Sequence, residues 1–576
     1  MSEDQNDKIA PWAEPDASAD TRTHHPEHLE SWKLFMVIGS LCLAIFLHGL
    51  DTNIVGVAMP KITTEFNSLD DIAWYGSSYL LTVTAFQPLF GNLYKYFLAK
   101  PVYLASIFTF EIGSIICAAA PNSTVLILGR SILGLGAAGL LQGALAIIGY
   151  AVKLEKVPQY QGIVISAFGI SVCTGPIIGG ALTDRTSWRW CFWINVPAGL
   201  LVIVLILVFV RIQPKANQVN QNLPLSKKLA HLDAVGTILF IVGVCCLLIV
   251  LQLGGHTIAW KSSKAIGLLV GFATIIASFG VLQWYRGEYA TIPPRVLARR
   301  SIYTGALVLF FLGMSSLTVS YSRRVFSDVD DSQYTYYLPI YFQSIQGVSA
   351  TQSGVRFIAL VVPQIVLLVV TGAVVSKVGF YVPFILLGIM IDCIGAGLIT
   401  TIKVGTPTIQ WAVFLVINGI GIGMAQQLPY TALQAVLDPL DVATGNAIAV
   451  FSFQLGGALG IAIAQNLFLN KLSRAIPNYT TDVSPQMVIN AGAMGLPLLA
   501  KSPDILLALR RAYADAIRYT LILSLVAACV AFPWALGMEW LNIRKIAEAR
   551  RAETAEKADG LTSTVIEDKA GAAELQ

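Results

Sequence analysis

The stretch Gly169-Ile-Ser-Val-Cys-Thr-Gly175-Pro176-Ile-Ile-Gly179-Gly180-Ala-Leu-Thr-Asp184 lies in an apolar segment with almost no charge. Its glycines remove side chains from one face of a predicted helix, so a neighbouring helix can approach to backbone distance, as small residues allow in membranes. Pro176 removes one backbone donor and predicts a kink at this point. Taken alone, the stretch fits an ordinary packing helix better than a functional one. The rest of the sequence is needed to distinguish these two interpretations.

The composition of the chain places it in a membrane. Of 576 residues, 55% are hydrophobic and only 12% are charged, whereas soluble domains carry about 25% charged residues. The net charge of +4 comes without a long basic block, so nothing indicates a nucleic-acid partner. The eight cysteines lie in apolar runs without a CxxC pair or a histidine cluster, which predicts neither a metal site nor a disulfide framework.

Apolar stretches of about 20 residues recur along the chain, and each is long enough to cross a bilayer as a helix. We therefore predict an all-α integral membrane protein with 14 transmembrane helices. The predicted spans are 34–57, 73–93, 102–120, 124–149, 162–183, 191–210, 234–253, 265–285, 302–319, 355–376, 380–401, 410–430, 444–466 and 517–540.

The loops between these spans predict the orientation. If the N-terminus lies inside, the inner loops carry the excess of lysine and arginine, which favours both termini in the cytoplasm. Residues 1–33 are polar and acidic and predict a disordered cytoplasmic tail. Residues 541–576 predict a second cytoplasmic tail that begins with a short helix. Residues 467–516 then form an extracellular loop, in which Asn478-Tyr-Thr480 is a candidate glycosylation site.

A charged block, residues 319–333, interrupts a helix that would otherwise run from Ser301 to Ser344. Removing the block joins two apolar segments smoothly. Its first residues, Val-Ser, can be encoded by GTAAGT and its last, Gln, by CAG, which resemble the two ends of an intron. We hypothesise a retained intron; the alternative is a genuine extracellular loop. Sequencing the transcript decides between them.

Asp51, Glu111, Arg130 and Asp392 are charged residues that lie inside predicted spans, away from the last two residues at either end. A charge at the centre of a membrane helix costs about 2.5–3.5 kcal/mol on insertion scales, so such residues are functional candidates by default. Arg130, among several glycines, is the strongest candidate. Asp392 is the weakest, because a single buried acid can simply hydrogen-bond a neighbour.

Uncharged polar residues also recur within the spans and indicate a cavity for a large, mostly uncharged organic molecule. Interhelical hydrogen bonding is the common alternative for such side chains. The candidates are Asn53, Tyr79, Gln87, Gln142, Gln364, Asn418, Gln426, Asn446 and Gln454. The chain has no GxxxxGK[ST] and no HExxH motif, so we expect neither an ATP-driven pump nor an enzyme.

Several motifs resemble those of a known family. Gly169–Gly180 is similar to the antiporter motif of the drug:proton antiporters of the major facilitator superfamily. Leu128-Gly-Arg130 with Gly134 and Gly136 resembles the family's fourth-helix motif, whose arginine is tied to proton coupling. The segments 50–60 and 188–199 are similar to motifs of its fourteen-span branch.

The segments 336–343 and 347–356 narrow the resemblance to fungal fourteen-span pumps that export mycotoxins and other secondary metabolites. The resemblance covers residues 34–540. One motif departs from the pattern: in the loop between the second and third spans, Lys95 stands where the family has an aspartate. The resemblance therefore does not extend to the ionic contact that this loop usually makes on the cytoplasmic face.

The resemblance implies two six-helix bundles, residues 34–211 and 302–540, with two extra central helices in residues 212–301. It implies alternating access driven by the proton gradient, without any other cofactor. Arg130, Asp51 and Glu111 would couple to protons, and Gly169, Gly175, Pro176, Gly179 and Gly180 would form the antiporter motif. The partners would be a small-molecule substrate, protons and membrane lipid. The chain would be a monomer in the plasma membrane, with a vacuolar or vesicular membrane as the alternative.

The predicted function is therefore proton-coupled export of a hydrophobic toxin, secondary metabolite or drug. One alternative is a proton-coupled importer, such as a siderophore transporter, since residues alone do not give the direction of flux. The other is a membrane sensor that does not transport.

Overall fold

The computed structural model describes residues 31–66, 68, 71–210, 224–254, 258–320, 342, 345–346, 350–438, 440–491, 495–553 and 556. These residues form helices and connecting turns, with no named strand among them. Most of the hypothesised intron, residues 321–333, lies outside this described part. The same holds for residues 1–30 and for nearly all residues after 553.

The first bundle comprises six helical segments that match the first six predicted spans. They are α1 (Ser31–Phe66), α2 (Ile72–Ala85) with α3 (Gln87–Tyr96), α4 (Ala99–Ala118), α5 (Ser123–Ala151), α6 (Val157–Arg185), and α7 (Trp190–Trp193) with α8 (Asn195–Phe209). Between the bundles lie α9 (Leu225–Ala230), α10 (Ala234–Leu253), α11 (Ser263–Arg286) and the short α12 (Pro294–Leu297).

The second bundle repeats this arrangement. Its segments are α13 (Arg300–Ser320), α15 (Ala350–Val378), α16 (Val382–Ile399), α17 (Thr408–Ala425) with α18 (Leu428–Val436), α19 (Val442–Tyr479) and α22 (Pro503–Leu536). Two short helices, α20 (Pro485–Ala491) and α21 (Leu496–Leu499), precede α22. All six segments coincide with predicted spans, so the two-bundle fold with two central helices is the one the protein adopts.

Thirteen helices of the described part are long and apolar enough to cross a membrane. The one predicted span that is not among them, 73–93, is divided at Phe86 into α2, of 14 residues, and α3, of 10. Pro88 stands in the first turn of α3. Because proline lacks a backbone N–H, it favours the start of a helix over its interior. Because of this division, neither α2 nor α3 alone is long enough to cross a membrane.

The two bundles use the same set of helix pairs. In the first, α1 packs on α6 and α8, α4 packs on α5 and α8, and α2 packs on α5. In the second, α13 packs on α19 and α22, α16 packs on α17 and α22, and α15 packs on α17. The order along the chain is identical, so each helix of the first bundle has a counterpart in the second.

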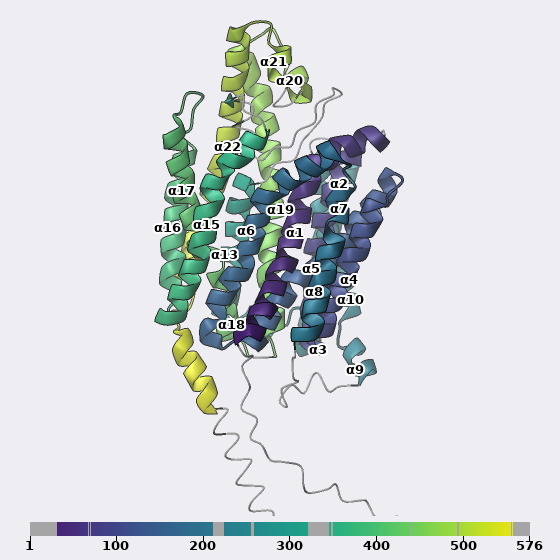
Figure 1. The fold of residues 1–576 in the computed structure, drawn as a ribbon, viewed down its shortest axis with the longest axis vertical. Coiled ribbons are helices and arrows are strands. Elements are labelled where there is room, and N and C mark those ends of the chain that lie inside the picture. Colours follow the sequence, from purple (N-terminus) through teal and green to yellow (C-terminus); the bar gives the residue numbers. More distant parts are fainter. Residues whose placement is uncertain are drawn as a thin grey trace, which may run out of the picture.

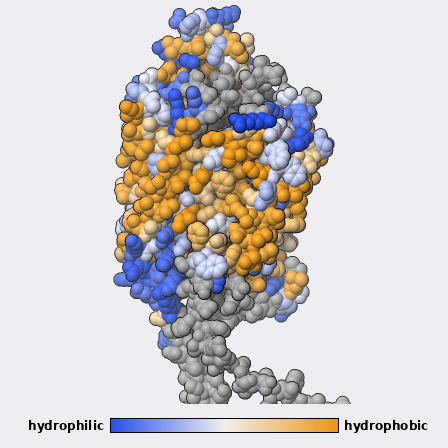
Figure 2. Space-filling model, in the orientation of Figure 1, coloured by the Kyte–Doolittle hydropathy of each residue, from blue (hydrophilic) through white to orange (hydrophobic). Residues whose placement is uncertain are grey.

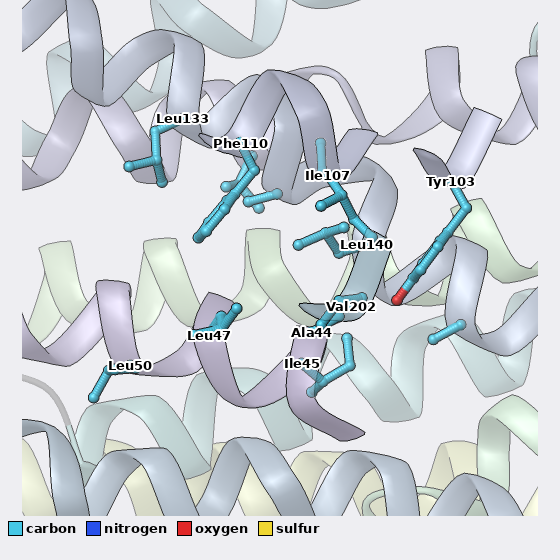
Figure 3. Packing of buried hydrophobic residues seen from close by; sticks show 14 of the residues in the cluster. Ala44, Ile45, Leu47, Leu50, Tyr103, Ile107, Phe110, Leu133, Leu140 and Val202 are labelled. Atoms are coloured by element: carbon cyan, nitrogen blue, oxygen red, sulfur yellow. The ribbon is translucent and has the colours of Figure 1, made fainter. Parts of the chain in front are cut away.

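An apolar core fills the first bundle (Figure 3). Ala44, Leu47 and Leu50 of α1 are nearly fully buried, as are Ile107 of α4 and Leu140 of α5. In the close view, Leu47 points toward the helices that carry Ile107 and Leu140. Because lipid tails are as apolar as these side chains, the helices are held together here by van der Waals packing.

The outer surface is apolar around the middle and polar at both ends (Figure 2). Exposed side chains in the apolar belt include Leu200 and Leu207 of α8 and Val270 of α11. Such a belt matches the hydrocarbon layer of a bilayer. The start of α1 and the helix at residues 543–553 lie at one end of the bundle, and α20 and α21 lie at the other (Figure 1).

The predicted loop 467–516 is largely helical instead. The 38 residues of α19 and the 34 residues of α22 both extend past their predicted spans. In these extensions Leu472 and Ile476 of α19 and Leu509 and Tyr513 of α22 remain buried at helical spacing. Hydropathy marks only the part of a helix inside the bilayer, so it misses this packed extension. Asn478 is exposed in the last turn of α19.

Candidate functional site

The centre of the first bundle holds a buried ion pair. Arg130 of α5 is 1% exposed, and its Nη1 donates to Oδ2 of Asp51 on α1, which is fully buried. Its Nε donates to the carbonyl oxygen of Tyr75 at 2.8 Å. The guanidinium carbon lies 4.4 Å from the centroid of the Tyr79 ring, an attractive cation–π geometry. The buried cation is thus compensated on three sides, which such a charge requires.

Asp51 also connects α1 to the third and sixth segments of the bundle, α4 and α8. Asn195 Nδ2, at the start of α8, lies 3.5 Å from Asp51 Oδ1 and donates to Ser114 Oγ of α4 at 2.9 Å. Ser114 in turn donates to the carbonyl of Phe192 at 3.0 Å. A change in the charge of Asp51 therefore acts on α1, α4, α5 and α8 together.

Glu111 lies one turn before Ser114 on α4. It is 7% exposed, and within the described residues neither carboxylate oxygen has a hydrogen-bond partner. A Cβ added at Gly199 of α8 would collide with its Oε1, so the carboxyl group lies directly against α8. An ionised carboxylate buried without a partner is costly. This makes Glu111 a candidate for holding a proton.

His48, which was not among the predicted site residues, lies on α1 one turn before Asp51. Its Nδ1 is 2.6 Å from the hydroxyl of Tyr79, and its ring centroid is 5.6 Å from that of Phe168 on α6. The histidine is 3% exposed. Tyr79 therefore touches a titratable imidazole at its hydroxyl and Arg130 at its ring face. A histidine within an apolar span was the signal that could have identified it.

The glycine-proline stretch forms part of α6, which continues through Pro176. A Cβ at Gly175 would lie 3.0 Å from Asn53 Cβ, and one at Gly179 would lie 2.8 Å from Ile54 Cγ1, both on α1. A Cβ at Gly169 would lie 3.0 Å from Ile365 Cγ1 on α15 of the other bundle. α6 is thus packed between the helix that carries Asp51 and the opposite bundle. Pro176 and Gly180 are half-buried.

Most of the predicted cavity residues bond within or between helices. Gln142 Nε2 donates to both the carbonyl oxygen and Oε1 of Gln87, and both residues are buried. Asn53 Nδ2 donates to the carbonyl of Gly49 at 2.6 Å.

In the second bundle, Asn446 Oδ1 accepts from Gln434 at 2.9 Å, and Gln364 Nε2 donates to Gln426 Oε1 at 2.8 Å. Gln364, Gln426 and Gln454 are half-buried. Part of the surface of these three side chains is therefore accessible, whereas the fully buried amides hydrogen-bond within and between helices.

The end of the bundle that carries the start of α1 has an ion-pair cluster between the two halves. Lys95 Nζ, in the last turn of α3, lies 3.4 Å from Oδ1 of Asp441, the residue before α19. Arg295 of α12 lies 2.7 Å from the other oxygen of Asp441. The family's aspartate is missing from the loop, yet a charge contact is present with the positive partner on the first bundle.

Close helix packing adds to this contact at the same end. Thr431 Oγ1 of α18 donates to Gln161 Oε1 of α6 at 2.7 Å. A Cβ at Gly372 of α15 would lie against the carbonyl of Pro158 on α6. The two bundles are therefore joined firmly here. Within the described residues, no group of three His, Cys, Asp or Glu could hold a metal ion.

Comparison with known proteins agrees with this architecture. Residues 41–461 match the Major Facilitator Superfamily. The chain is 41% identical to the MFS-type efflux pump MFS1 of Trichophyton rubrum, over 90% of this chain and 93% of that one. It is 37% identical to the efflux pump aflT of Aspergillus parasiticus, over 90% and 98% of the two chains.

Among solved structures, the proton:xylose symporter XylE aligns with a TM-score of 0.55 at 14% identity, covering 90% of this chain and 99% of that one. At this identity the likeness concerns the fold alone. Taken with the family match and the efflux pumps, it leads to one conclusion: the chain belongs to the major facilitator superfamily.

Proposed function

We propose that this protein is a proton-coupled exporter of hydrophobic small molecules that works by alternating access. The observation that carries the proposal is the Arg130–Asp51 pair inside the first bundle, with Glu111 buried beside it. Intramembrane charges of this kind mark ion or proton pathways. The relatives named as efflux pumps support export as the direction of flux.

The packing around the ion pair suggests how a proton would move the bundles. Protonating Asp51 removes the charge that holds Arg130 Nη1, so α1 and α5 lose their strongest contact. α1 packs against Gly175 and Gly179 of α6, and α6 packs through Gly169 against α15. A shift of α1 is therefore passed to the boundary between the bundles, where carriers of this type rock.

The proton gradient is sufficient as the energy source. Each proton entering down the membrane potential supplies about 2.3 kcal/mol per 100 mV. That corresponds to a concentration ratio of the exported molecule of roughly fifty-fold for one proton. We therefore propose no cofactor besides the gradient.

The substrate we propose is a toxin, secondary metabolite or drug that is soluble enough in lipid to reach the bundle from the membrane. The relatives include an aspyridones efflux protein of Neocamarosporium betae, 38% identical over 89% of this chain. The half-buried amides Gln364, Gln426 and Gln454 are the candidates for orienting such a molecule. We place the carrier in the plasma membrane as a monomer, with both termini in the cytoplasm.

The test is dye retention in yeast cells that express the full chain. Rhodamine 6G serves as the hydrophobic probe, measured with and without a protonophore. We expect lower retention than in cells without the carrier, full retention when the protonophore is present, and full retention with Arg130→Ala at equal surface expression. Arg474→Ala, at an exposed position of α19, is the matched control and keeps export normal.

Two results overturn parts of the proposal. Higher retention with the carrier than without it establishes import. Export by Arg130→Ala at the wild-type rate removes the coupling role of the ion pair.

A further inference from the structure

The second bundle holds a buried polar cluster that the proposed mechanism does not use. Asp392 of α16 is fully buried, and its Oδ1 accepts from Asn418 Nδ2 of α17 at 2.7 Å. Its Oδ2 lies 3.5 Å from Ser315 Oγ of α13, which lies 3.0 Å from Ser524 Oγ of α22. All four residues are at most 1% exposed. The cluster thus joins four helices of the bundle.

Asp392 has no counter-ion in the described part of the chain. No lysine, arginine or histidine there forms an ion pair with it within 4.0 Å. Its hydrogen-bonding neighbours are the hydroxyl of Ser315 and the amide of Asn418, and Ser524 contacts Ser315 in turn. The next residue in the chain, Cys393, is titratable as well, and its thiol lies 3.7 Å from that of Cys529. This environment differs from that of Asp51, which has Arg130 beside it.

The equivalent place in the first bundle shows that packing does not require an acid here. α4 and α5 are the counterparts of α16 and α17. A Cβ at Gly136 would meet the backbone of Phe110, and one at Gly113 would meet Leu133.

In the second bundle, a Cβ at Gly421 would meet Asp392 in the same way, and one at Gly395 would meet Asn418. Asp392 and Asn418 therefore occupy the places that Phe110 and Leu133 hold in the first bundle. An apolar pair fills the same helix contact there, so a structural role alone does not account for a carboxyl group whose ionised form is costly inside a membrane helix.

Asn418 fits a carboxyl group that changes its protonation state. Its Nδ2 donates to Asp392, while its Oδ1 accepts no hydrogen bond within the described residues. Turning the amide by half a rotation would present this oxygen to a proton on Asp392. The N–H···O bond is then replaced by an O–H···O bond, so the side chains of Asp392 and Asn418 remain joined by one hydrogen bond. The same two residues satisfy both the ionised and the neutral acid.

We propose that Asp392 is a second proton-binding residue of the carrier, located in the second bundle and satisfied in both states by Asn418. The inference rests on the proposed proton-coupled export and adds a further proton to its cycle. The proton comes from water on one side of the membrane and leaves to water on the other. With a proton bound in each bundle, the membrane potential acts on two charges in each cycle instead of one.

The first test needs no substrate. Infrared difference spectra of the purified full chain, taken from about pH 5 to about pH 9, report the C=O stretch of protonated carboxyl groups. We expect Asp392→Asn to remove one titrating carboxyl signal. Asp482→Asn, at an exposed acid, serves as the control and leaves this signal in place. Identical spectra for the wild type and Asp392→Asn would overturn the proposal.

A second variant guards against misfolding of the first. Asn418→Ala keeps the carboxyl group but removes its amide partner, so the signal should remain and titrate at a different pH. A signal that titrates at the same pH in Asn418→Ala contradicts the role of the amide.

The second test measures transport in proteoliposomes loaded with rhodamine 6G. For Asp392→Asn, we expect gradient-driven export to fall on the order of tenfold, within the usual range of coupling free energies, while dye exchange at equal pH continues. Loss of both activities together indicates a structural role. If the wild type does not move the dye, the proposed function fails for this probe, whereas the infrared result still decides whether Asp392 binds a proton.

Discussion

Lys95 and Asp441 join the two bundles through an ion pair of 3.4 Å, although 346 positions separate them in the chain. Their side chains are only 7% and 4% exposed. Arg295, from the segment between the bundles, binds the second oxygen of Asp441 at 2.7 Å. One buried carboxylate thus connects the first bundle, the central segment and the second bundle.

This arrangement predicts a graded loss of transport. Lys95→Ala removes one of two cations from Asp441, and we expect a loss of about fivefold, the lower end of common coupling effects. Asp441→Asn leaves both cations without their acceptor and should cost more, because removing one partner of a buried pair costs about 3–5 kcal/mol. Initial rates of dye export from cells with matched surface expression measure both.

Lys95→Arg is the control for this contact, since it preserves the charge and should keep the rate. The idea fails if Lys95→Ala and Lys95→Arg export the dye equally well.

Tyr79 allows two roles in the buried site to be separated. Tyr79→Phe removes the hydroxyl that contacts His48 at 2.6 Å but keeps the ring 4.4 Å from Arg130. Tyr79→Leu removes both contacts. We expect Tyr79→Phe to change the pH profile of export with a modest effect on the maximum rate, and Tyr79→Leu to lower the rate further, since a desolvated cation–π contact contributes about 2 kcal/mol. Export rates across a pH series measure both effects, and equal profiles for all three proteins would rule out a part for His48.

The close contact between α6 and α1 predicts intolerance to side chains at Gly175. Gly175→Val places new carbons against Asn53, whose Cβ would lie 3.0 Å from the first of them. Overpacking of this kind costs about 1–3 kcal/mol, so we expect a lower thermal midpoint and slower export. Gly149→Val on α5, where no atom lies within 4 Å, is the matched control. Fluorescence-detected thermal denaturation of detergent-solubilised protein compares the two, and equal midpoints would refute the prediction.

A pH-dependent contact braces the first bundle at the end opposite the charge cluster. Glu65, in the last turn of α1 beyond its apolar stretch, accepts from Trp188 Nε1 at 2.6 Å and from Arg189 Nη1 at 2.7 Å. Partial burial alone would favour the neutral acid, but these hydrogen bonds and the charge of Arg189 outweigh it and lower the pKa of Glu65 below its ordinary value.

A lowered pKa gives a definite sign to the effect of pH on stability. The contribution of Glu65 is present above its pKa in the unfolded chain, about 4.3, and is lost as the pH falls through the lower folded value. We expect Glu65→Gln to have a lower thermal midpoint than the wild type at neutral pH. The difference should close as the pH falls below about 4. A difference that stays constant into acid would show that the charge of Glu65 is not involved.

The fold was predictable because a bilayer requires about 20 apolar residues for each helix. The two departures have physical reasons. Pro88 divides the second span at Phe86, and a hydropathy window does not detect a proline. The extensions of α19 and α22 pack on each other outside the apolar belt, where amphipathic spacing rather than overall hydropathy decides the structure.

The candidate site was predictable only in part. Asp51, Glu111 and Arg130 are visible in the sequence because a charge in an apolar span is costly. The partner of Lys95 was not predictable, since no local pattern relates α3 to the start of α19. Nor does the sequence distinguish the amide of Gln142, which bonds Gln87 between two helices, from the half-buried amide of Gln454.

The length of α19 makes the position of its far end sensitive to small rotations of the helix. Its 38 residues form a rod about 57 Å long. The rod begins beside the Asp441 cluster and ends near α20 and α21 (Figure 1). A tilt of a few degrees at the lower end becomes a displacement of several ångströms at the upper end. A spectroscopic label or an antibody fragment placed on that tip would therefore register, or arrest, the rocking of the second bundle without touching the path of the substrate.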